Sequence, residues 1–194
     1  MMFDFRQTRR SDAALVVLVA EGDERAFAEI LKRHQDAVYG FALRMLNDPQ
    51  EAEDAAQETF LRFFRAAGRY SNEASLRTYL LKILKNFCID LYRKKRPELM
   101  EYLPELKDAS TPLDLLEKAL TVERLEKTIS CLPVNQRTAV LLRHTEQMSY
   151  SEIAEVMDLS LGAVESLLVR GRRTLRQALI KDTVDGEINR KHKH

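Results

Sequence analysis

The side chains best suited to chemistry lie on one face of the segment that follows Ser160. That face holds five residues at helical spacing: Glu165, Ser166, Val169, Arg170 and Arg173. Carboxylate, hydroxyl and guanidinium groups can hydrogen-bond the base edges that DNA exposes in its major groove. The chemistry predicted here is recognition by hydrogen bonding.

Two short helices joined by a tight turn are predicted to position this face. Ser149 and Glu152 form a capping box that begins the first helix. The pattern breaks at 158–160, and Ser160 can cap the second helix, which buries a stripe of Val164, Leu168, Gly171 and Leu175. The stretch 149–176 therefore has the helix-turn-helix pattern. A helical hairpin with an ordinary solvated basic face is the alternative.

Catalytic patterns are missing from the sequence. There is no Gly-rich phosphate loop, no histidine-glutamate metal helix and no nucleophile elbow. Cys88 and Cys131 have no metal-ligand spacing, and the four histidines do not cluster. We therefore expect no enzyme activity, no metal, no cofactor and no small-molecule substrate. The cysteine usage, and the lack of an apolar run of about 20 residues, favour a cytoplasmic protein.

Charge is separated along the chain although the formal net charge is only +1. Residues 47–58 hold five acids and no base, whereas residues 75–96 hold seven bases and one acid. Local surfaces of opposite sign predict two kinds of partner.

The acidic segment is predicted to be a helix from Asp48 to about Ala67. On it Asp54, Gln57, Glu58 and Leu61 share one face. Such a face is usually just solvated, but it also suits the helix of a protein partner.

The basic segment is predicted to be a helix from Ser75 to Lys95, with Tyr79, Phe87 and Tyr92 interleaved among the bases. Unstacked bases of a single strand can lie on such rings while cations follow the phosphates. Burial of the rings, with the bases left in water, is the alternative.

The whole chain is predicted to be all-α, with two small helical domains joined by a flexible linker, the C-terminal one containing the helix-turn-helix. Further helices are expected at 11–20, 23–46, 111–131 and 134–144. The predicted divisions are an N-terminal bundle at 1–97, an acidic linker at 98–112, a C-terminal domain at 113–181 and a polar tail at 182–194. The residues after Ile180 are expected to be disordered.

Three motifs in this order resemble a known family. The acidic DAAQETFLRFF, the basic SLRTYLLKILKNFCIDLYRKKRP and the terminal LPVNQRTAVLLRHTEQMSYSEIAEVMDLSLGAVESLLVRGRRTLRQAL resemble a bacterial RNA polymerase sigma factor. The resemblance is to the extracytoplasmic-function (ECF) group of the sigma-70 family and covers about residues 10–180. It implies a protein that binds core RNA polymerase, recognises a two-part promoter and helps to melt it so that transcription of a specific regulon begins.

The resemblance also implies roles for particular residues. The acidic helix docks on the clamp helices of the polymerase through Asp54, Gln57 and Glu58, with Leu61 on the same face. The basic helix and the loop 70–76 bind and open the minus-ten element, with a flipped base held by the loop. The residues implied for the minus-ten element are Tyr70, Asn72, Arg77, Lys82, Lys85, Asn86, Arg93 and Lys94. Those implied for the minus-thirty-five element are Ser149, Ser160, Glu165, Ser166, Val169, Arg170, Arg172 and Arg173. The linker is expected to thread toward the polymerase active centre, and an anti-sigma factor, often membrane-bound, is the further partner implied.

Two positions depart from the family pattern on the reading helix. Glu165 and Leu167 stand where basic residues are common, on or near the expected reading face. Glu165 repels phosphates but can accept a hydrogen bond from a cytosine amino group, so we expect an unusual promoter sequence. In the loop, Tyr70 and Leu76 stand where larger aromatics are frequent.

Two other functions fit the residues. One is a stand-alone helix-turn-helix regulator whose N-terminal bundle senses a signal or dimerises. It would bind a palindromic duplex site without polymerase. The other is an interaction protein that sequesters a regulator and never touches DNA.

Overall fold

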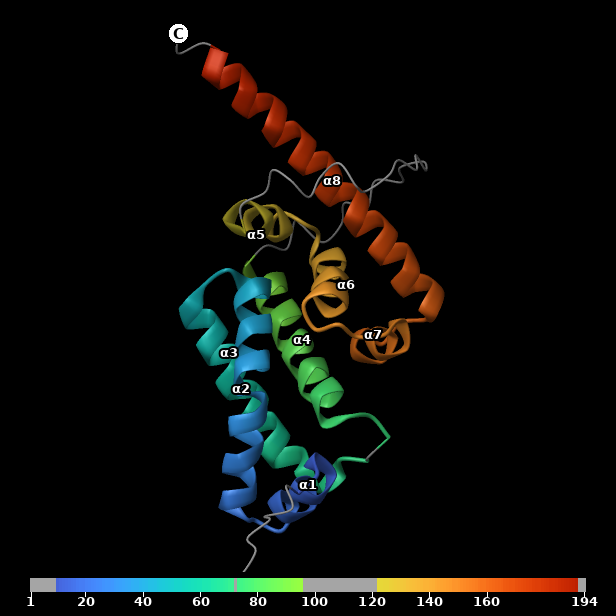
Figure 1. The fold of residues 1–194 in the computed structure, drawn as a ribbon. Helices are drawn as coiled ribbons and strands as arrows, with labels where there is room; N and C mark the ends of the chain where they lie inside the picture. The colour runs from blue at the N-terminus through green and yellow to red at the C-terminus, as the bar shows by residue number, and fades with distance from the viewer. Residues whose placement is uncertain (1–9, 72, 96–121, 192–194) are drawn as a thin grey trace, which may run out of the picture.

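The computed structural model describes residues 10–71, 73–95 and 122–191, and all the regular structure in these ranges is helical. The helices are α1 (Asp12–Ala20), α2 (Glu24–Leu46), α3 (Pro49–Ala66), α4 (Leu76–Lys95), α5 (Val122–Ser130), α6 (Val134–His144), α7 (Tyr150–Met157) and α8 (Leu161–Lys191), with one 3-10 turn at Ala67–Arg69. Figure 1 shows α1–α4 as one bundle and α5–α8 as a second. The predicted all-α class is confirmed for the described residues, while the predicted linker 98–112 lies outside them.

Single residues at helix ends set the turns of the N-terminal bundle. Ser11 caps α1 and Asp23 caps α2, each through a side-chain oxygen that accepts main-chain N–H groups. Asn47 ends α2 in the left-handed conformation, with φ 55°, and Asp48 with Pro49 begins α3. The sequence predicted each of these boundaries, and the structure confirms them.

The core of this bundle lies where α2, α3 and α4 meet. Its largest fully buried side chains are Ile30, Phe41, Met45, Phe63, Leu80, Leu81 and Leu84. Burial of each such side chain stabilises the fold by roughly 1.5–3 kcal/mol, so packing holds these helices together more than intrinsic propensity does.

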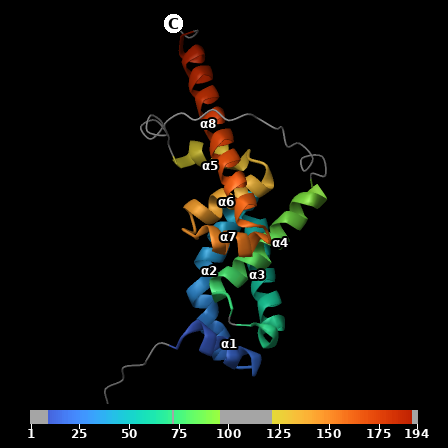
Figure 2. The same ribbon diagram turned by 90° about the vertical axis from the view of Figure 1, so that its right-hand side faces the viewer.

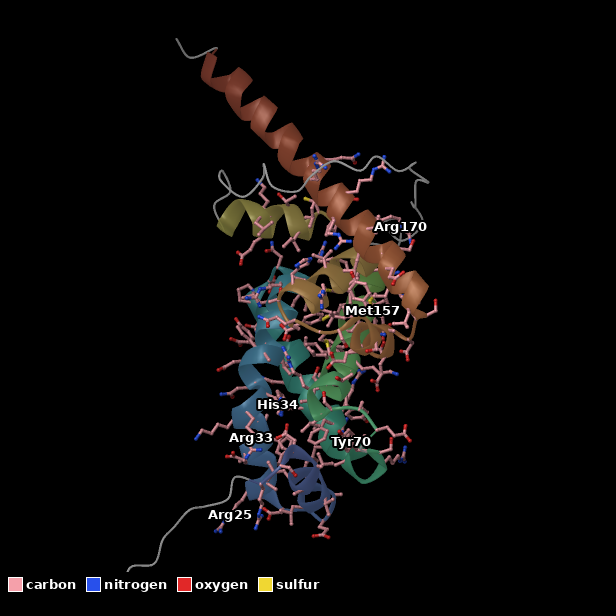
Figure 3. The ribbon with its side chains drawn as sticks, turned by 45° about the vertical axis from the view of Figure 1, so that its right-hand side comes forward. Arg25, Arg33, His34, Tyr70, Met157 and Arg170 are labelled. Carbon is pink, nitrogen blue, oxygen red and sulfur yellow. The ribbon has the colours of Figure 1, made fainter. Side chains whose placement is uncertain are left out.

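A polar cluster fastens α1 to α2. Arg33 and His34 of α2 both contact the carboxylate of Asp12, each at 2.9 Å. Figure 3 shows these two side chains directed toward α1. Partial burial raises the pKa of Asp12, but the hydrogen bonds from Arg33 and His34 outweigh it and hold that pKa below its ordinary value. Asp12 therefore stays ionised and keeps α1 in place.

The C-terminal bundle contains the predicted helix-turn-helix as α7, a turn at 158–160 and α8. Val164 and Leu168 of α8 and Ile153 of α7 are fully buried against α6, as the predicted apolar stripe requires. α8 extends well past this packed region, and its last turns project beyond the other helices (Figure 2).

For residues 181–191 the predicted disorder is wrong, because α8 continues to Lys191, whereas residues 192–194 lie outside the described residues. A polar composition argues against a packed core but not against a helix. Once nucleated, a helix adds one hydrogen bond per residue, so it can propagate beyond its last packed turn.

The two bundles pack directly on each other. α7 lies against α4, and α5 and α6 lie against the C-terminal half of α2 (Figures 1 and 2). Arg137 of α6 is 4% exposed and donates to the main-chain oxygen of Met45 in α2, at 2.7 Å, and to the hydroxyl of Tyr92 in α4. Within the described ranges, no helix is both long and apolar enough to cross a membrane.

Candidate functional site

A groove of about 600 Å³ lies between α2 and α3. Its α3 wall includes Gln57 and Leu61, both exposed and both predicted to bind a partner. Leu61 is 42% exposed, which is high for an apolar side chain, and Phe64 one turn on is 41% exposed. Asp54 is exposed on the same helix. The predicted face therefore borders a largely apolar depression, as a helix-docking surface would.

Glu58 is placed differently from the other predicted members of this face. Its carboxylate accepts a hydrogen bond from Arg62, at 2.7 Å, one turn along α3. The Arg62 guanidinium in turn lies 5.2 Å from the ring centre of Phe87 in α4. Glu58 thus orients Arg62 at the α3–α4 contact and is not among the residues that line the groove.

The second wall of the groove comes from α2, and the sequence analysis did not predict it. It holds Phe27, Leu31, Gln35, Asp36 and Tyr39. Four of these recur every four residues, at 27, 31, 35 and 39, beside the buried stripe that contains Ile30 and Val38. In the sequence, the buried residues and the groove-lining residues of α2 form a single apolar pattern. Only the way α3 packs on α2 decides which of them are buried and which line the groove.

The predicted DNA-facing residues of α4 fall into two sets. Asn86, Arg93 and Lys94 are exposed, with Arg93 only loosely paired to Asp90 at 3.8 Å. The other set, which comprises Arg77, Lys82 and Lys85, is matched by acids of the C-terminal bundle. Asn72, which was also predicted to bind DNA, lies outside the described residues.

The cations in this second set have close partners. Lys82 approaches one carboxylate oxygen of Asp158 at 2.5 Å and Lys85 approaches the other at 3.5 Å, while Arg77 meets Glu146 at 2.5 Å. Lys85 is 5% exposed, so it does not stand on a free surface as predicted for a DNA contact. Burial lowers the pKa of Lys85, and the charge and hydrogen bond of Asp158 oppose that effect.

The loop before α4 is shaped by Tyr70. Its hydroxyl donates to the main-chain oxygen of Ala74, at 2.5 Å, and its ring packs edge-on against Tyr79, with centroids 5.2 Å apart. Burial raises the pKa of Tyr70, so the phenol keeps its proton. These contacts join Tyr70 to Ala74 and to Tyr79 of α4, while Asn72 between them lies outside the described residues. Ser75 stands just before the first residue of α4, and its hydroxyl accepts from the Thr78 N–H at 3.1 Å.

The aromatic residues of α4 make contacts within the protein. Tyr92 donates its hydroxyl to Met45, at 2.7 Å, and its ring lies under the Arg137 guanidinium. Phe87 and Tyr79 are half-buried against Arg62 and Tyr70. In this arrangement the rings pack within the bundles. This favours the alternative that the rings are buried as part of the fold rather than stacked on bases of a DNA strand.

Ser149 and Ser160 serve as helix caps. The Ser149 main-chain N–H and hydroxyl both donate to Glu152, at 2.8 and 2.7 Å, and its oxygen accepts from the Glu152 N–H. These hydrogen bonds hold the pKa of Glu152 below its ordinary value. The Ser160 hydroxyl accepts from the Ala163 N–H at 3.3 Å. The predicted capping box and second cap are both confirmed.

The predicted reading face of α8 is open to solvent. Glu165 and Ser166 are exposed and Val169 is 51% exposed, whereas Arg170, Arg172 and Arg173 are half-buried. Arg170 bends its guanidinium back to the Ser166 main-chain oxygen, at 3.2 Å. Leu161 at the start of α8 is also 53% exposed. The exposed face thus combines carboxylate, hydroxyl and apolar groups, all of which can contact base edges.

Leu167 does not belong to this face, contrary to expectation. It is 7% exposed and packs in the C-terminal core. A basic residue at this point would be expensive to bury without a partner. The departure at Leu167 is therefore a matter of packing, whereas Glu165 lies on the exposed face of α8.

Gly171 allows α8 to lie close to α6. A Cβ at this position would stand 2.8 Å from the Val140 side chain and 3.5 Å from the Gln136 main-chain oxygen. Thr174, one turn later, donates its hydroxyl to the Gln136 side chain at 3.2 Å. The missing side chain at 171 and this hydrogen bond set the distance and register of α8 against α6.

Within the part of the chain that the structure describes, no three His, Cys, Asp or Glu residues gather as metal ligands would. Cys88 is buried, and burial raises its pKa to about 12, so its thiol is unreactive at neutral pH. Cys131 is exposed at the end of α5.

Comparison with known proteins gives matches to both bundles. Residues 30–98 match the family model Sigma-70 region 2, and residues 122–175 match the model Sigma-70, region 4. The chain is 34% identical to the RNA polymerase sigma-H factor of Pseudomonas aeruginosa over 188 residues, covering 89% of this chain and 95% of that one. It is 31% identical to the ECF RNA polymerase sigma factor SigW of Bacillus subtilis, covering 83% and 92% of the two chains. Among solved structures, CnrH in complex with the cytosolic domain of CnrY superposes with a TM-score of 0.68 at 26% identity, covering 89% and 99%.

Proposed function

Because this chain belongs to the extracytoplasmic-function group of the sigma-70 family and is a sigma factor of transcription initiation, we propose the following roles for its surfaces. The groove between α2 and α3 binds core RNA polymerase, α4 with its preceding loop binds the melted minus-ten element, and α8 reads the minus-thirty-five duplex. The N-terminal bundle, residues 1–97, and the C-terminal domain, residues 113–181, are the units that carry these roles on either side of the linker 98–112.

The observation that carries the proposal is the exposed face of α8 on a capped helix-turn-helix. Leu161, Glu165 and Val169 recur every four residues on the solvent side, next to Ser166 and Arg170. The first turns of the second helix are the part of such a unit that reaches base edges. Val169 and Leu161 are suited to thymine methyl groups and Glu165 to a cytosine amino group. Ser149 and Ser160 act through the caps that orient the two helices.

For core polymerase, the proposal is supported by the groove. Exposed Leu61 and Phe64 stand beside Gln57 and Asp54, so an apolar strip is bordered by polar groups. Docked interfaces share this arrangement of an apolar centre with a polar rim. The α2 side chains Phe27, Leu31 and Tyr39 complete the surface and belong to the same interface.

For the minus-ten element, the proposal is supported by cations beside a shaped loop. Arg93, Lys94 and Asn86 present exposed polar groups along α4, and Tyr70 holds the loop in place next to the first turn. Arg77, Lys82 and Lys85 extend the same row of cations once their acidic partners leave. A row of cations along one helix suits the phosphates of a single strand.

An anti-sigma factor is the further proposed partner. CnrH was solved with the cytosolic domain of CnrY, and it shares the fold of this chain over most of its length. We infer that this chain acts in the cytoplasm, where promoter DNA and polymerase are found. It brings no catalysis of its own, because bond formation belongs to the polymerase it binds.

Run-off transcription tests the proposal directly. Bacterial core polymerase, the purified chain and a linear template library with randomised upstream sequence should yield transcripts that start downstream of an enriched two-part motif. Core polymerase alone should yield none above background. If the folded chain co-elutes with core but no motif is enriched, the DNA roles are wrong; if it fails to co-elute, the groove assignment is wrong.

A further inference from the structure

A polar pocket of about 300 Å³ lies where the α2–α3 turn, the C-terminal part of α4 and the α5–α6 region meet. The turn and the start of α3 contribute Asp48 and Glu51, α4 contributes Tyr92, and the C-terminal bundle contributes Arg137. The pocket shares no lining residue with the groove between α2 and α3. Its volume is at the lower end of the range of about 300–1,000 Å³ for small-molecule pockets, so a small ligand fits it.

Arg137 brings to this pocket an N–H donor that has no acceptor. A guanidinium group has five N–H donors. Its Nη1 donates to the main-chain oxygen of Met45 and to the hydroxyl of Tyr92. Its Nη2 donates to the main-chain oxygens of Ser130 and Leu132. The fifth donor, Nε–H, is buried and has no hydrogen-bond partner among the described residues. Because buried polar groups are nearly always hydrogen-bonded, and an unpaired charged donor is the costliest exception, this N–H indicates a further acceptor at the pocket.

The two acids of the pocket are held at the start of α3. Asp48 caps this helix, because its Oδ1 accepts from the Glu51 N–H at 3.0 Å, and Glu51 is the acid of the first turn. Both residues are half-buried. Their carboxylates are suited to an ammonium group, which carries three donors. The N-terminal bundle thus supplies acceptors to the pocket, and the C-terminal bundle supplies a donor.

The mixed charge of the lining selects the class of ligand. A simple anion would accept from Arg137 but would be repelled by Asp48 and Glu51, and a simple cation would meet the opposite difficulty. A molecule that carries both charges a few bonds apart offers each group a partner of opposite sign. Leu46 and Leu91 complete the lining and can contact a short aliphatic part of such a molecule.

We propose that this pocket binds a small zwitterion of the amino-acid type. The carboxylate of the ligand accepts from the Nε–H of Arg137, and its ammonium group donates to Asp48 and Glu51. The proposal goes beyond the roles in transcription initiation and does not depend on them, because none of its residues is assigned to DNA or to core polymerase.

A bound zwitterion would contact both bundles at once. Asp48 and Glu51 belong to the first bundle and Arg137 to the second, so the site is complete only where the two meet. A ligand that binds one arrangement of a protein stabilises it in proportion to ligand concentration. The concentration of the zwitterion is therefore coupled to the contact between the bundles.

The test is an NMR titration of the full isotope-labelled chain, in which the Arg137 Nε–H signal and the main-chain amides are followed. The probe is L-alanine, which carries both charges. Its two halves are ethylammonium, which lacks the carboxylate, and propionate, which lacks the ammonium group. The Nε–H signal is identified by its absence from the spectrum of Arg137→Lys. Ionic strength is held constant, because salt screens weak contacts between charges.

Two substitutions remove the acids of the pocket, and two others match them. Asp48→Asn removes a charge but keeps the helix cap, because Asn caps a helix as well as Asp does. Glu51→Gln removes the second charge. Asp23→Asn combined with Glu24→Gln is the matched control, since Asp23 caps α2, Glu24 lies in its first turn, and neither lines the pocket. Thermal melting by circular dichroism confirms that each variant is folded.

We expect L-alanine to shift the Arg137 Nε–H signal saturably and to bind at least about ten-fold more tightly than either half, because each half lacks one set of charge-assisted hydrogen bonds. Asp48→Asn combined with Glu51→Gln should weaken the binding of L-alanine by about ten-fold or more for the same reason. The control pair should leave the dissociation constant unchanged.

Four outcomes would overturn the proposal. The first is the lack of a saturable shift with L-alanine up to about 100 mM, a concentration that reveals even weak binding. Equal binding of propionate would mean an adventitious anion on Arg137, and equal binding of ethylammonium would mean an unselective acidic surface. Equal weakening by the control pair would mean a general charge effect. Because the titration contains neither polymerase nor DNA, these outcomes leave the roles of the other surfaces untouched.

Discussion

The guanidinium of Arg137 in α6 donates to the main-chain oxygen of Met45 in the last turn of α2, at 2.7 Å. One residue of the C-terminal bundle thus satisfies a carbonyl at a helix end of the other bundle. The same side chain also donates to the main-chain oxygens of Ser130, the last residue of α5, and of Leu132 just beyond it. Arg137 therefore organises its own bundle and the contact between bundles together.

Replacement of Arg137 by alanine should lower the free energy of unfolding by about 2–4 kcal/mol, because several buried acceptors lose a charged donor. Arg137→Lys should retain only part of the stability that alanine loses, since an ammonium group does not reproduce the planar, forked set of donors of a guanidinium group. Urea denaturation followed by circular dichroism measures both. Arg65→Ala, at an exposed site of α3, is the control and should change stability by no more than about 0.5 kcal/mol. Equal effects at 137 and 65 would contradict the structural role.

Gly162 and Gly171, both on α8, offer a matched pair. Gly171→Ala should destabilise the chain by about 1–3 kcal/mol, because the new methyl would stand 2.8 Å from Val140 in the packed α6–α8 contact. Gly162→Ala meets nothing within 4 Å and should stabilise the helix by up to about 1 kcal/mol through propensity alone. Melting temperatures of the two variants should move in opposite directions. A shift in the same direction would mean that α8 packs differently.

Local features of this fold were predictable from the sequence, and contacts between the bundles were not. Ser11, Asp23, Asp48 and Ser149 act on residues two to four positions away, so their roles appear directly in the sequence. Lys85 and Asp158 are separated by 73 positions, and nothing in either segment marks them as partners.

In the candidate site, too, features carried by a single helix were predictable and features that depend on packing between helices were not. The exposed face of α8 followed from helical spacing, because one face of one helix carries it. The α2 wall of the groove and the burial of Leu167 depend on which neighbouring helix covers each stripe, and this is decided by tertiary packing. The end of α8 was mispredicted because polar residues were equated with disorder.

Acid should weaken the helix-turn-helix through Glu152. Its folded pKa is lowered by hydrogen bonds from Ser149, so it adds stability that is present above its ordinary pKa and is lost as the pH falls through the lowered value. Glu152→Gln should reduce the free energy of unfolding at neutral pH. It should also make that free energy depend less steeply on pH in the acid range. Urea midpoints across the acid range measure the slope, and Glu155→Gln on the same helix should leave it unchanged. An unaltered slope in Glu152→Gln would rule out this contribution.

Core polymerase binding should depend on the groove between α2 and α3. Leu61→Ala combined with Gln57→Ala should weaken the affinity for core by about ten-fold or more, because central interface residues commonly contribute 1–2 kcal/mol or more each. Fluorescence titration of labelled chain with core polymerase gives the dissociation constant. Leu159→Ala, an exposed leucine of the turn before α8, is the control for loss of apolar surface. Equal weakening by the control would place the interface elsewhere.

Promoter choice should depend on Glu165. If its carboxylate accepts from a cytosine amino group, Glu165→Arg should change the preferred base at one minus-thirty-five position by about 1–3 kcal/mol and leave minus-ten preference unchanged. Sequencing of transcripts from a randomised library compares the variant with the parent. Glu126→Gln on α5 provides a charge control away from the reading face. A uniform gain across all sequences would mean that residue 165 only repels phosphates.

The length of α8 has a mechanical consequence. Its 31 residues correspond to an uninterrupted rod of about 46 Å, at 1.5 Å of rise per residue, and its last turns project beyond the other helices (Figure 2). A tilt of about 10° at the packed end would carry the far end through roughly 8 Å at that length. The helix is thus a lever that magnifies small rotations of the helix-turn-helix, and a spectroscopic label on its last turn would report such rotations with high sensitivity.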